Sequence, residues 1–225
     1  MPSAGRREFH MTKEAVRSKI LEVGIVPVVR ASSPEQALLA AGAVAEGGIP
    51  IVEITMTVPG AIAVIEQLAR TVGTEVLIGA GTVLDPDTAQ RCFDAGAEFL
   101  VSPGFDAGTV QLARRLGKLV MPGALTPTEV ITAFRAGADF VKVFPCGNVG
   151  GPAYIRSLKA ALPQIPMIPT GGVNLQTAAE FLRAGASALG IGGELVSKTA
   201  LEAGDAATIT ETARRYKSVI GEARP

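Results

Sequence analysis

Residues 135–145 read Arg-Ala-Gly-Ala-Asp-Phe-Val-Lys-Val-Phe-Pro and join the end of a helical pattern to a short apolar strand. Glycine directly after a helical segment is typical of a helix C-cap, and the run that follows is β-branched and aromatic, as strands are. The same junction recurs at residues 94–97 and 183–186, each time before another apolar run. A chain that alternates helices and strands in this way is predicted to build a parallel sheet with helices packed against it.

Outward from this stretch, the apolar runs recur along the whole chain. Successive run centres lie 20 to 27 residues apart, which leaves room for one strand, one helix and two short loops. Such repeats predict an α/β protein of the (β/α)8 TIM-barrel class. An amphipathic pattern over residues 11–23 predicts an additional N-terminal helix that packs through Ala15, Ile20 and Leu21. The strand centres are Val28, Val52, Leu77, Leu100, Val120, Val141, Ile168 and Leu189.

The sequence also indicates where several helices begin and how many domains the chain forms. Three crossover helices are predicted to begin at Ser33-Pro34, Asp85-Pro86 and Thr126-Pro127-Thr128-Glu129, where a capping side chain precedes proline at the first turn. No linker or shift in composition divides the chain, so residues 11–225 are predicted to form a single (β/α)8 barrel domain. Residues 1–10 are predicted to be a flexible leader.

The composition argues against several classes of function. The 225 residues include 21 Lys and Arg and 21 Asp and Glu, a net charge of zero that argues against nucleic acid as a partner and against a polybasic membrane anchor. Apolar residues make up 48% of the chain, yet no run reaches the ~18 residues that a membrane-spanning helix needs. The first ten residues lack the apolar segment of a secretory signal. We therefore expect a soluble cytoplasmic protein in which Cys92 and Cys146 are reduced.

The single histidine, His10, lies in the predicted leader. A folded body without histidine cannot use histidine-ligated metal sites or Ser-His and Cys-His catalysis. We therefore expect chemistry in which no histidine takes part. TIM barrels carry their active sites at the carboxyl ends of the strands, so candidate residues are sought there.

Lys142 is the one lysine that lies inside an apolar strand, at residues 140–144. Alternation along the strand puts Phe140, Lys142 and Phe144 on one face, so if the valines between them pack on the helices, the amine points into the barrel mouth. Burial there lowers the pKa of an amine, and a neutral amine can attack a ketone to form a Schiff base. The alternatives are a structural pair with Glu53 and simple binding of a substrate anion.

Glu53 is a second ionisable group in an apolar run, at residues 51–55. Schiff-base chemistry needs a group that moves protons, and in a barrel without histidine a partly buried carboxyl near Lys142 can do so. A purely structural ion pair is the alternative. Arg30 ends the first strand and could bind a carboxylate through two parallel hydrogen bonds, or it could be an ordinary loop residue.

Glycines gather at the ends of three strands, within residues 79–82, 170–173 and 190–193. The loops after strands seven and eight of TIM barrels often hold phosphate on backbone N–H groups at helix starts, and glycine lets a ligand approach the backbone closely. The Thr82 hydroxyl is available to an acid or carbonyl group. The residues predicted to form a phosphate site are Thr170, Gly171, Gly172, Gly192 and Gly193.

Together these residues resemble the family of 2-keto-3-deoxy-6-phosphogluconate (KDPG) and 4-hydroxy-2-oxoglutarate (KHG) aldolases. The resemblance covers about residues 13–222 and is carried by five motifs in order along the chain. It implies a class I, metal-independent aldolase without a cofactor, which forms a homotrimer and acts in the Entner–Doudoroff pathway. The motifs are Val52-Glu53-Ile54-Thr55, Gly79-Ala80-Gly81-Thr82-Val83-Leu84, Phe99-Leu100-Val101-Ser102-Pro103-Gly104, Val141-Lys142-Val143-Phe144-Pro145 and Pro169-Thr170-Gly171-Gly172-Val173.

The resemblance implies a role for each matching position. Lys142 would form the Schiff base and Glu53 would be the general acid and base. The implied substrate is a 2-keto-3-deoxy acid, with KDPG cleaved to pyruvate and glyceraldehyde 3-phosphate, and 4-hydroxy-2-oxoglutarate cleaved to pyruvate and glyoxylate. Implied substrate contacts are Thr82 and Pro103 in the pyruvate pocket, Phe144 beside the imine, and Thr170, Gly171 and Gly172 at the distal group.

Two positions depart from the family pattern. Some members carry an arginine in a Glu-x-Thr-x-Arg pattern that helps hold the substrate carboxylate; this chain has Thr57 there, so Arg30 is predicted to supply the guanidinium. Several members place a serine near the strand-eight glycines, where this chain reads Gly192-Gly193-Glu194. Three alternatives stay open: the galactonate epimer as substrate, a phosphosugar isomerase or epimerase on the same barrel, and a non-catalytic trimeric scaffold.

Overall fold

A computed structural model describes residues 11–223, and the predicted leader, residues 1–10, lies outside the described residues. The strands are β1 (Ile25–Val29), β2 (Ile51–Thr55), β3 (Leu77–Gly81), β4 (Phe99–Val101), β5 (Leu119–Met121), β6 (Gly123–Ala124), β7 (Val141–Val143), β8 (Met167–Pro169) and β9 (Leu189–Ile191). The helices are α1 (Lys13–Val23), α2 (Pro34–Glu46), α3 (Ala61–Thr71), α4 (Pro86–Asp94), α5 (Ala107–Arg115), α6 (Pro127–Ala136), the 3-10 turn η1 (Gly147–Val149), α7 (Pro152–Ala161), α8 (Ala178–Arg183), α9 (Lys198–Glu202) and α10 (Ala206–Ala223).

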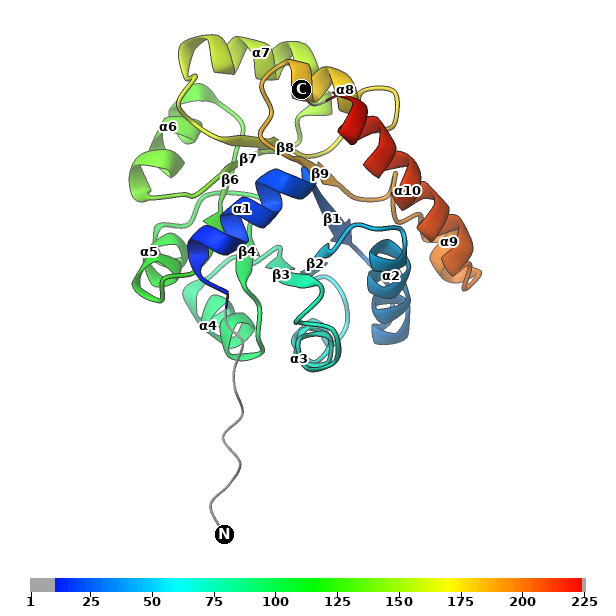
Figure 1. The fold of residues 1–225 in the computed structure, drawn as a ribbon. Coiled ribbons are helices and arrows are strands. Elements are labelled where there is room, and N and C mark those ends of the chain that lie inside the picture. Colours follow the sequence, from blue (N-terminus) through cyan, green and yellow to red (C-terminus); the bar gives the residue numbers. More distant parts are fainter. Residues whose placement is uncertain (1–10, 224–225) are drawn as a thin grey trace.

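The strands form a curled parallel sheet with the helices around it (Figure 1). Strands β5-β4-β3-β2-β1-β9 pair in that order, and β6-β7-β8 form a second group. A bridge between Thr170 and Gly190 links the end of β8 to β9, and Pro122 alone separates β5 from β6, so the two groups complete one barrel. The predicted (β/α)8 class is confirmed, and each predicted strand centre lies within a strand.

The fifth barrel strand is divided at Pro122, a break that the sequence analysis did not predict. On the side that faces the segment after β4, the carbonyl of Met121 accepts a hydrogen bond from Ser102 N–H at 3.2 Å. The next hydrogen bond to that segment is donated by Gly123 N–H to the carbonyl of Gly104 at 3.1 Å. Proline between them has no N–H to donate. Its carbonyl still accepts from Lys142 N–H at 3.0 Å, so the strand remains attached to β7.

Alternate residues of the strands face two separate cores. Val141 and Val143 belong to the outer core between sheet and helices. The inner core fills the barrel, and Glu53 and Lys142 lie two residues beyond Ile51 and Phe140, two of its members, along their strands. Both ionisable side chains therefore face the barrel interior above the inner core. The inner core comprises Val16, Ile20, Val26, Ile51, Leu77, Phe99, Val101, Leu119, Met121, Phe140, Ile168 and Ala188.

The predicted N-terminal helix is present as α1 and covers one end of the barrel (Figure 1). The prediction of its packing face is only partly right. Val16 and Ile20, four residues apart, are buried in the inner core, whereas Ala15 is only half-buried because it lies on the neighbouring face. An ion pair of 2.6 Å between Lys13 and Asp139 holds this helix at the start of β7.

The predicted helix starts are confirmed. Ser33 accepts a hydrogen bond from Gln36 N–H, and Asp85 accepts one from Thr88 N–H at 2.7 Å. Thr126 and Glu129 form a capping box at α6. Among residues 11–223, no helix is both long enough and apolar enough to cross a membrane.

Candidate active site

The predicted site residues meet at the end of the barrel opposite α1, which we call the barrel mouth. Glu53 lies within β2 and Lys142 within β7. Because parallel strands end at the same edge, the residues that follow them line one opening. The residues that follow the strands are Arg30 after β1, Thr57 after β2, Thr82 after β3, Pro103 after β4, Phe144 after β7, Thr170, Gly171 and Gly172 after β8, and Gly192 and Gly193 after β9.

Glu53 and Lys142 are both buried inside the barrel. Only 1% of Glu53 and 4% of Lys142 is exposed. The valines on either side of Lys142 face the outer core, so the predicted orientation of the amine is confirmed. The ring of Phe144 lies beside it, with the Lys142 Nζ atom 5.2 Å from the ring centre.

Burial favours the neutral forms of both groups. It raises the pKa of Glu53, against the opposing charges of Lys142 and Arg30. It lowers the pKa of Lys142, where the Glu53 carboxylate opposes the shift and the Arg30 guanidinium adds to it. The mouth can therefore hold a neutral amine, which is a nucleophile, next to a protonated carboxyl, which is a proton donor.

Arg30 is exposed and extends over the end of the neighbouring strand β9. Its Nη1 atom would lie only 2.8 Å from a Cβ at Gly192, so glycine leaves the space that the guanidinium occupies. The Arg30 charge acts on the pKa of both Glu53 and Lys142. The guanidinium that the sequence analysis predicted from strand one is therefore present at the mouth.

A pair of hydroxyls connects Thr57 to the strand that carries Arg30. Buried Thr55 donates to the carbonyl of Val29 at 3.0 Å, and the Thr55 and Thr57 hydroxyls lie 2.7 Å apart. Since the Thr55 proton is used on Val29, Thr57 is the donor of the second bond. Thr57 itself is exposed, and it reaches β1 only through the Thr55 hydroxyl.

Thr82 has a backbone conformation that only glycine adopts easily. Its φ is +59°, and among residues 11–223 it is the only non-glycine residue with a positive φ. A β-branched residue in the left-handed region is strained by about 1–3 kcal/mol, and such strain collects at functional sites. The half-buried Thr82 side chain thus stands at the end of β3 at a cost to stability.

The glycine loops lie at the mouth, but not at helix starts as predicted. Helix α8 begins at Ala178 and α9 at Lys198, several residues after the glycines. The loop after β8 instead packs against the η1 turn after β7: a Cβ at Gly172 would lie 2.6 Å from the Cα of Gly147, and both Gly171 and Gly172 have positive φ. The backbone at this edge can approach a ligand closely, without a helix dipole behind it.

Glu194 directly follows the strand-eight glycines and is exposed. Its carboxylate contributes to the raised pKa of buried Tyr216 in α10, after the larger effect of burial. It is not among the charges that shift the pKa of Lys142 or Glu53. This charge therefore acts on the α10 side of the loop rather than on Glu53 and Lys142.

Pro103 follows β4, and its backbone packs against β6. Its carbonyl group would lie 2.2 Å from a Cβ at Gly123, so the chain after β4 can touch β6 only because Gly123 lacks a side chain. Ser102, beside it, donates from its hydroxyl to the carbonyl of Gly104 at 2.6 Å. The loop that carries Pro103, the predicted pyruvate contact, is thus held by its packing against Gly123 and by the hydrogen bond from Ser102 to Gly104.

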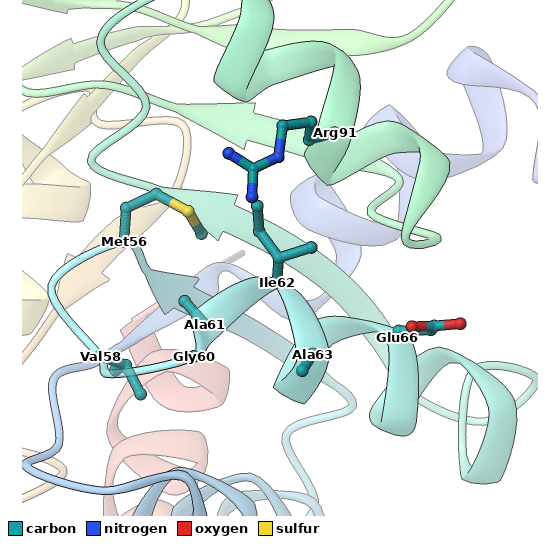
Figure 2. Close-up of a pocket in the computed structure, with 8 residues that line it drawn as sticks. All are labelled: Met56, Val58, Gly60, Ala61, Ile62, Ala63, Glu66 and Arg91. Carbon is teal, nitrogen blue, oxygen red and sulfur yellow. The ribbon is translucent and has the colours of Figure 1, made fainter.

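A pocket of about 490 Å³ lies outside the mouth, between the β2–α3 turn and α4. Figure 2 shows the residues that line it. Met56 and Ile62 point toward Arg91 in this view, and none of the predicted site residues lines it. The pocket is therefore separate from the Glu53 and Lys142 pair. In the described part of the chain, no three His, Cys, Asp or Glu side chains are grouped so that they could hold a metal ion.

The sequence analysis missed what the glycines of β3 and β9 do. Gly81 and Gly190 face the barrel interior, where a Cβ would lie 1.9 Å from the Glu53 Oε1 atom and 2.1 Å from the Thr170 Oγ1 atom, respectively. Alternation along β3 puts Gly79 and Gly81 on one face of the sheet, but by itself it does not show that Glu53 of β2 lies on that face. What was lacking was the register between neighbouring strands.

Comparison with known proteins agrees with this geometry. Residues 16–212 match the profile of the family described as KDPG and KHG aldolase. The chain is 36% identical over 172 residues to the 2-dehydro-3-deoxy-6-phosphogalactonate aldolase of Escherichia coli (strain K12), which covers 76% of this chain and 83% of that protein. It is 34% identical over 203 residues to the 2-dehydro-3-deoxy-phosphogluconate aldolase of Treponema pallidum (strain Nichols), which covers 88% and 94%. A KDPG aldolase from Legionella pneumophila, solved with pyruvate as a covalent carbinolamine intermediate, matches the fold with a TM-score of 0.82 at 30% identity, over 88% of this chain and 96% of that chain.

Proposed function

We propose that this chain, which belongs to the KDPG and KHG aldolase family and is a class I aldolase, cleaves KDPG to pyruvate and glyceraldehyde 3-phosphate. The observation that carries the proposal is the buried pair at the mouth. Lys142 and Glu53 face the same interior, and burial shifts the pKa of each toward its neutral form. Cleavage of 4-hydroxy-2-oxoglutarate to pyruvate and glyoxylate is proposed as a second activity of the same site.

The proposed mechanism begins at the Lys142 Nζ atom. The amine attacks the C2 carbonyl carbon of the 2-keto acid, and one proton passes from its nitrogen to the oxygen to give a carbinolamine. Glu53 gives that hydroxyl a second proton, so the C–O bond breaks, water leaves and an iminium ion forms. Glu53, now ionised, takes the proton of the C4 hydroxyl, the C3–C4 bond breaks, and its electron pair moves into the iminium to give an enamine. The aldehyde departs, and C3 of the enamine accepts the proton back from Glu53, which restores the iminium. Water then adds to C2 and the C–N bond breaks, which releases pyruvate and the neutral lysine, while the proton set free returns to the Glu53 carboxylate.

The other mouth residues are proposed to hold the substrate. Arg30 and the Thr82 hydroxyl bind the carboxylate next to the ketone, and Phe144 packs beside the imine. Pro103 lines the same pocket. The loops at Gly171 and Gly192, together with their neighbours Thr170, Gly172 and Gly193, bind the distal phosphate. The homotrimer and a cytoplasmic location stay predictions from the sequence.

Steady-state kinetics on matched substrates test the proposed substrate. We expect kcat/KM for KDPG to exceed that of the galactonate epimer by about 10-fold or more, which corresponds to one well-placed hydrogen bond. Removal of the phosphate is expected to lower kcat/KM by about 10²-fold, the effect of losing charge-assisted hydrogen bonds. A galactonate epimer that is cleaved faster than KDPG would assign the enzyme to that substrate instead.

Arg30 is expected to compensate for the missing arginine at position 57. Arg30→Ala should raise KM for the keto acid by about 10–10²-fold, because charge-assisted hydrogen bonds to the carboxylate are lost. The double variant Arg30→Ala with Thr57→Arg should recover at least part of that loss, since the guanidinium returns from strand β2. Arg30→Lys keeps the charge but lacks the planar guanidinium, so its KM should lie between those of the parent and Arg30→Ala. An unchanged KM in Arg30→Ala would show that another group holds the carboxylate.

A further inference from the structure

Strands β2 and β3 place a glycine beside the catalytic carboxyl. They are parallel neighbours, with Glu53 in register with Gly79 and Thr55 in register with Gly81. The Glu53 side chain leans along its strand toward the mouth, and so it comes to lie against Gly81 rather than against its register partner Gly79.

The Glu53 side chain occupies the position that a Cβ at Gly81 would take. The three heavy atoms nearest to a Cβ built at Gly81 are Glu53 Oε1 at 1.9 Å, Cδ at 2.6 Å and Cγ at 2.7 Å. The φ of Gly81 is not positive, so the backbone does not require glycine there. Glycine is needed because a methyl group and the carboxyl cannot occupy the same place.

No hydrogen bond fixes the inner oxygen of this carboxyl. Within residues 11–223, the buried Oε1 atom of Glu53 has no hydrogen-bond partner. The charges of Lys142 and Arg30 attract the ionised group, but charge alone does not select one rotamer. The close packing against the backbone at Gly81 therefore restricts the position of the Oε1 atom.

The two inward-facing glycines of β3, Gly79 and Gly81, make room for different side chains. A Cβ at Gly79 would lie 2.2 Å from two ring atoms of Phe99, a member of the inner core. Gly79 thus serves packing below the site, whereas Gly81, two residues further along, serves the site. The same arrangement recurs on β9, where Gly190 leaves space for the Thr170 hydroxyl.

We propose that Gly81 is a positioning residue that holds the Glu53 carboxyl within reach of Lys142 and the substrate. It acts through Glu53 and does not touch the reacting atoms. A methyl group at this position would turn the carboxyl away from its place, so proton transfer would slow while substrate binding is kept. The inference rests on the proposed role of Glu53 as the group that moves protons.

The test compares Gly81→Ala, Glu53→Asp and the double variant, with cleavage of the preferred substrate as the readout. Gly81→Ala is expected to lower kcat by about 10²-fold, the size of a general acid–base effect, with KM within about 3-fold of the parent and a displaced pH dependence of kcat. Aspartate is shorter by one methylene and fits beside alanine. In the double variant, Gly81→Ala should therefore cost at least about 10-fold less in kcat than it does in the parent chain.

Control variants separate this inference from stability and from the proposed function. Gly42→Ala, in α2 with nothing within 4 Å of the added methyl group, should leave kcat and its pH dependence unchanged. If Gly81→Ala does not fold but the double variant does, the added methyl group and the Glu53 carboxyl compete for the same space, as the proposal requires. The positioning role would be overturned if Gly81→Ala and the double variant both fail to fold, or if kcat of Gly81→Ala stays within 2-fold of the parent. It would also be overturned if the loss of kcat in the double variant equals the product of the losses in Gly81→Ala and Glu53→Asp. Full activity of Glu53→Gln would instead overturn the proposed function.

Discussion

Lys142→Arg is expected to lower turnover by about 10⁴-fold or more while the barrel stays folded, because it removes the nucleophile and keeps the positive charge. The side chain is 4% exposed, and burial lowers the pKa of its amine, so a neutral fraction is present for attack on the ketone. A guanidinium does not lose its proton in a protein and cannot form the imine. Charge alone therefore does not restore activity.

Borohydride reduction in the presence of pyruvate measures the covalent step directly. The parent protein should be inactivated, and peptide mapping should place a reduced pyruvate adduct on Lys142. Lys159→Arg is the matched control: burial also lowers the pKa of Lys159, but its Nζ atom bonds the carbonyls of Pro163 and Ile165 outside the mouth. That variant should be trapped as efficiently as the parent.

The same experiment tests the two remaining alternatives from the sequence. A phosphosugar isomerase that uses Lys142 only for its charge, and a scaffold without catalysis, both predict no stable adduct. An adduct on a different lysine, or undiminished trapping of Lys142→Arg, would contradict the mechanism proposed here. Retained turnover in Lys142→Arg would favour a role for the charge alone.

The orientation of Glu53 and Lys142 could be predicted from the sequence because it follows from local geometry. Side chains alternate along a strand, so the apolar neighbours of Lys142 and Glu53 identify the outward face. Helix starts such as Thr126 with Glu129 are equally local, since cap and partner lie three residues apart. Barrel closure followed from the regular spacing of the units.

What could not be predicted depends on contacts between distant residues. The space that Gly81 leaves for Glu53 needs the register of β2 against β3, which one-dimensional patterns do not contain. The strained φ of Thr82 arises where the chain leaves β3, and no preference of threonine would suggest it. The phosphate loops were predicted at helix starts by analogy with other barrels, whereas the helices here begin further along the chain.

Glu53→Gln is expected to lower kcat by about 10²–10⁴-fold, because the amide fits the same space but cannot exchange a proton. Trapping of pyruvate on Lys142 by borohydride should slow but still reach completion, since the nucleophile is intact. This combination separates proton transfer from nucleophilic attack, and it is measured by the time course of inactivation. Full turnover in Glu53→Gln would require a different proton carrier.

The stability of Glu53→Gln distinguishes a neutral buried carboxyl from a structural ion pair. Because folding raises the pKa of Glu53 above its ordinary value of 4.5, the folded state binds more protons than the unfolded state above that pH. The contribution of Glu53 to stability is therefore greatest below pH 4.5 and is lost as the pH rises through the raised pKa. Glutamine does not titrate, so the variant should match the parent at low pH and exceed it near neutral pH by about 1–3 kcal/mol in free energy of unfolding.

Urea unfolding at a series of pH values measures this difference. A structural ion pair predicts the opposite sign, because glutamine would leave the Lys142 ammonium buried without its partner, and breaking such a pair strongly destabilises a protein. A variant that is less stable than the parent at neutral pH and equal to it in acid would therefore favour the ion pair. A variant that is more stable and nearly inactive would show that the protein keeps Glu53 buried for its chemistry, against the stability of the fold.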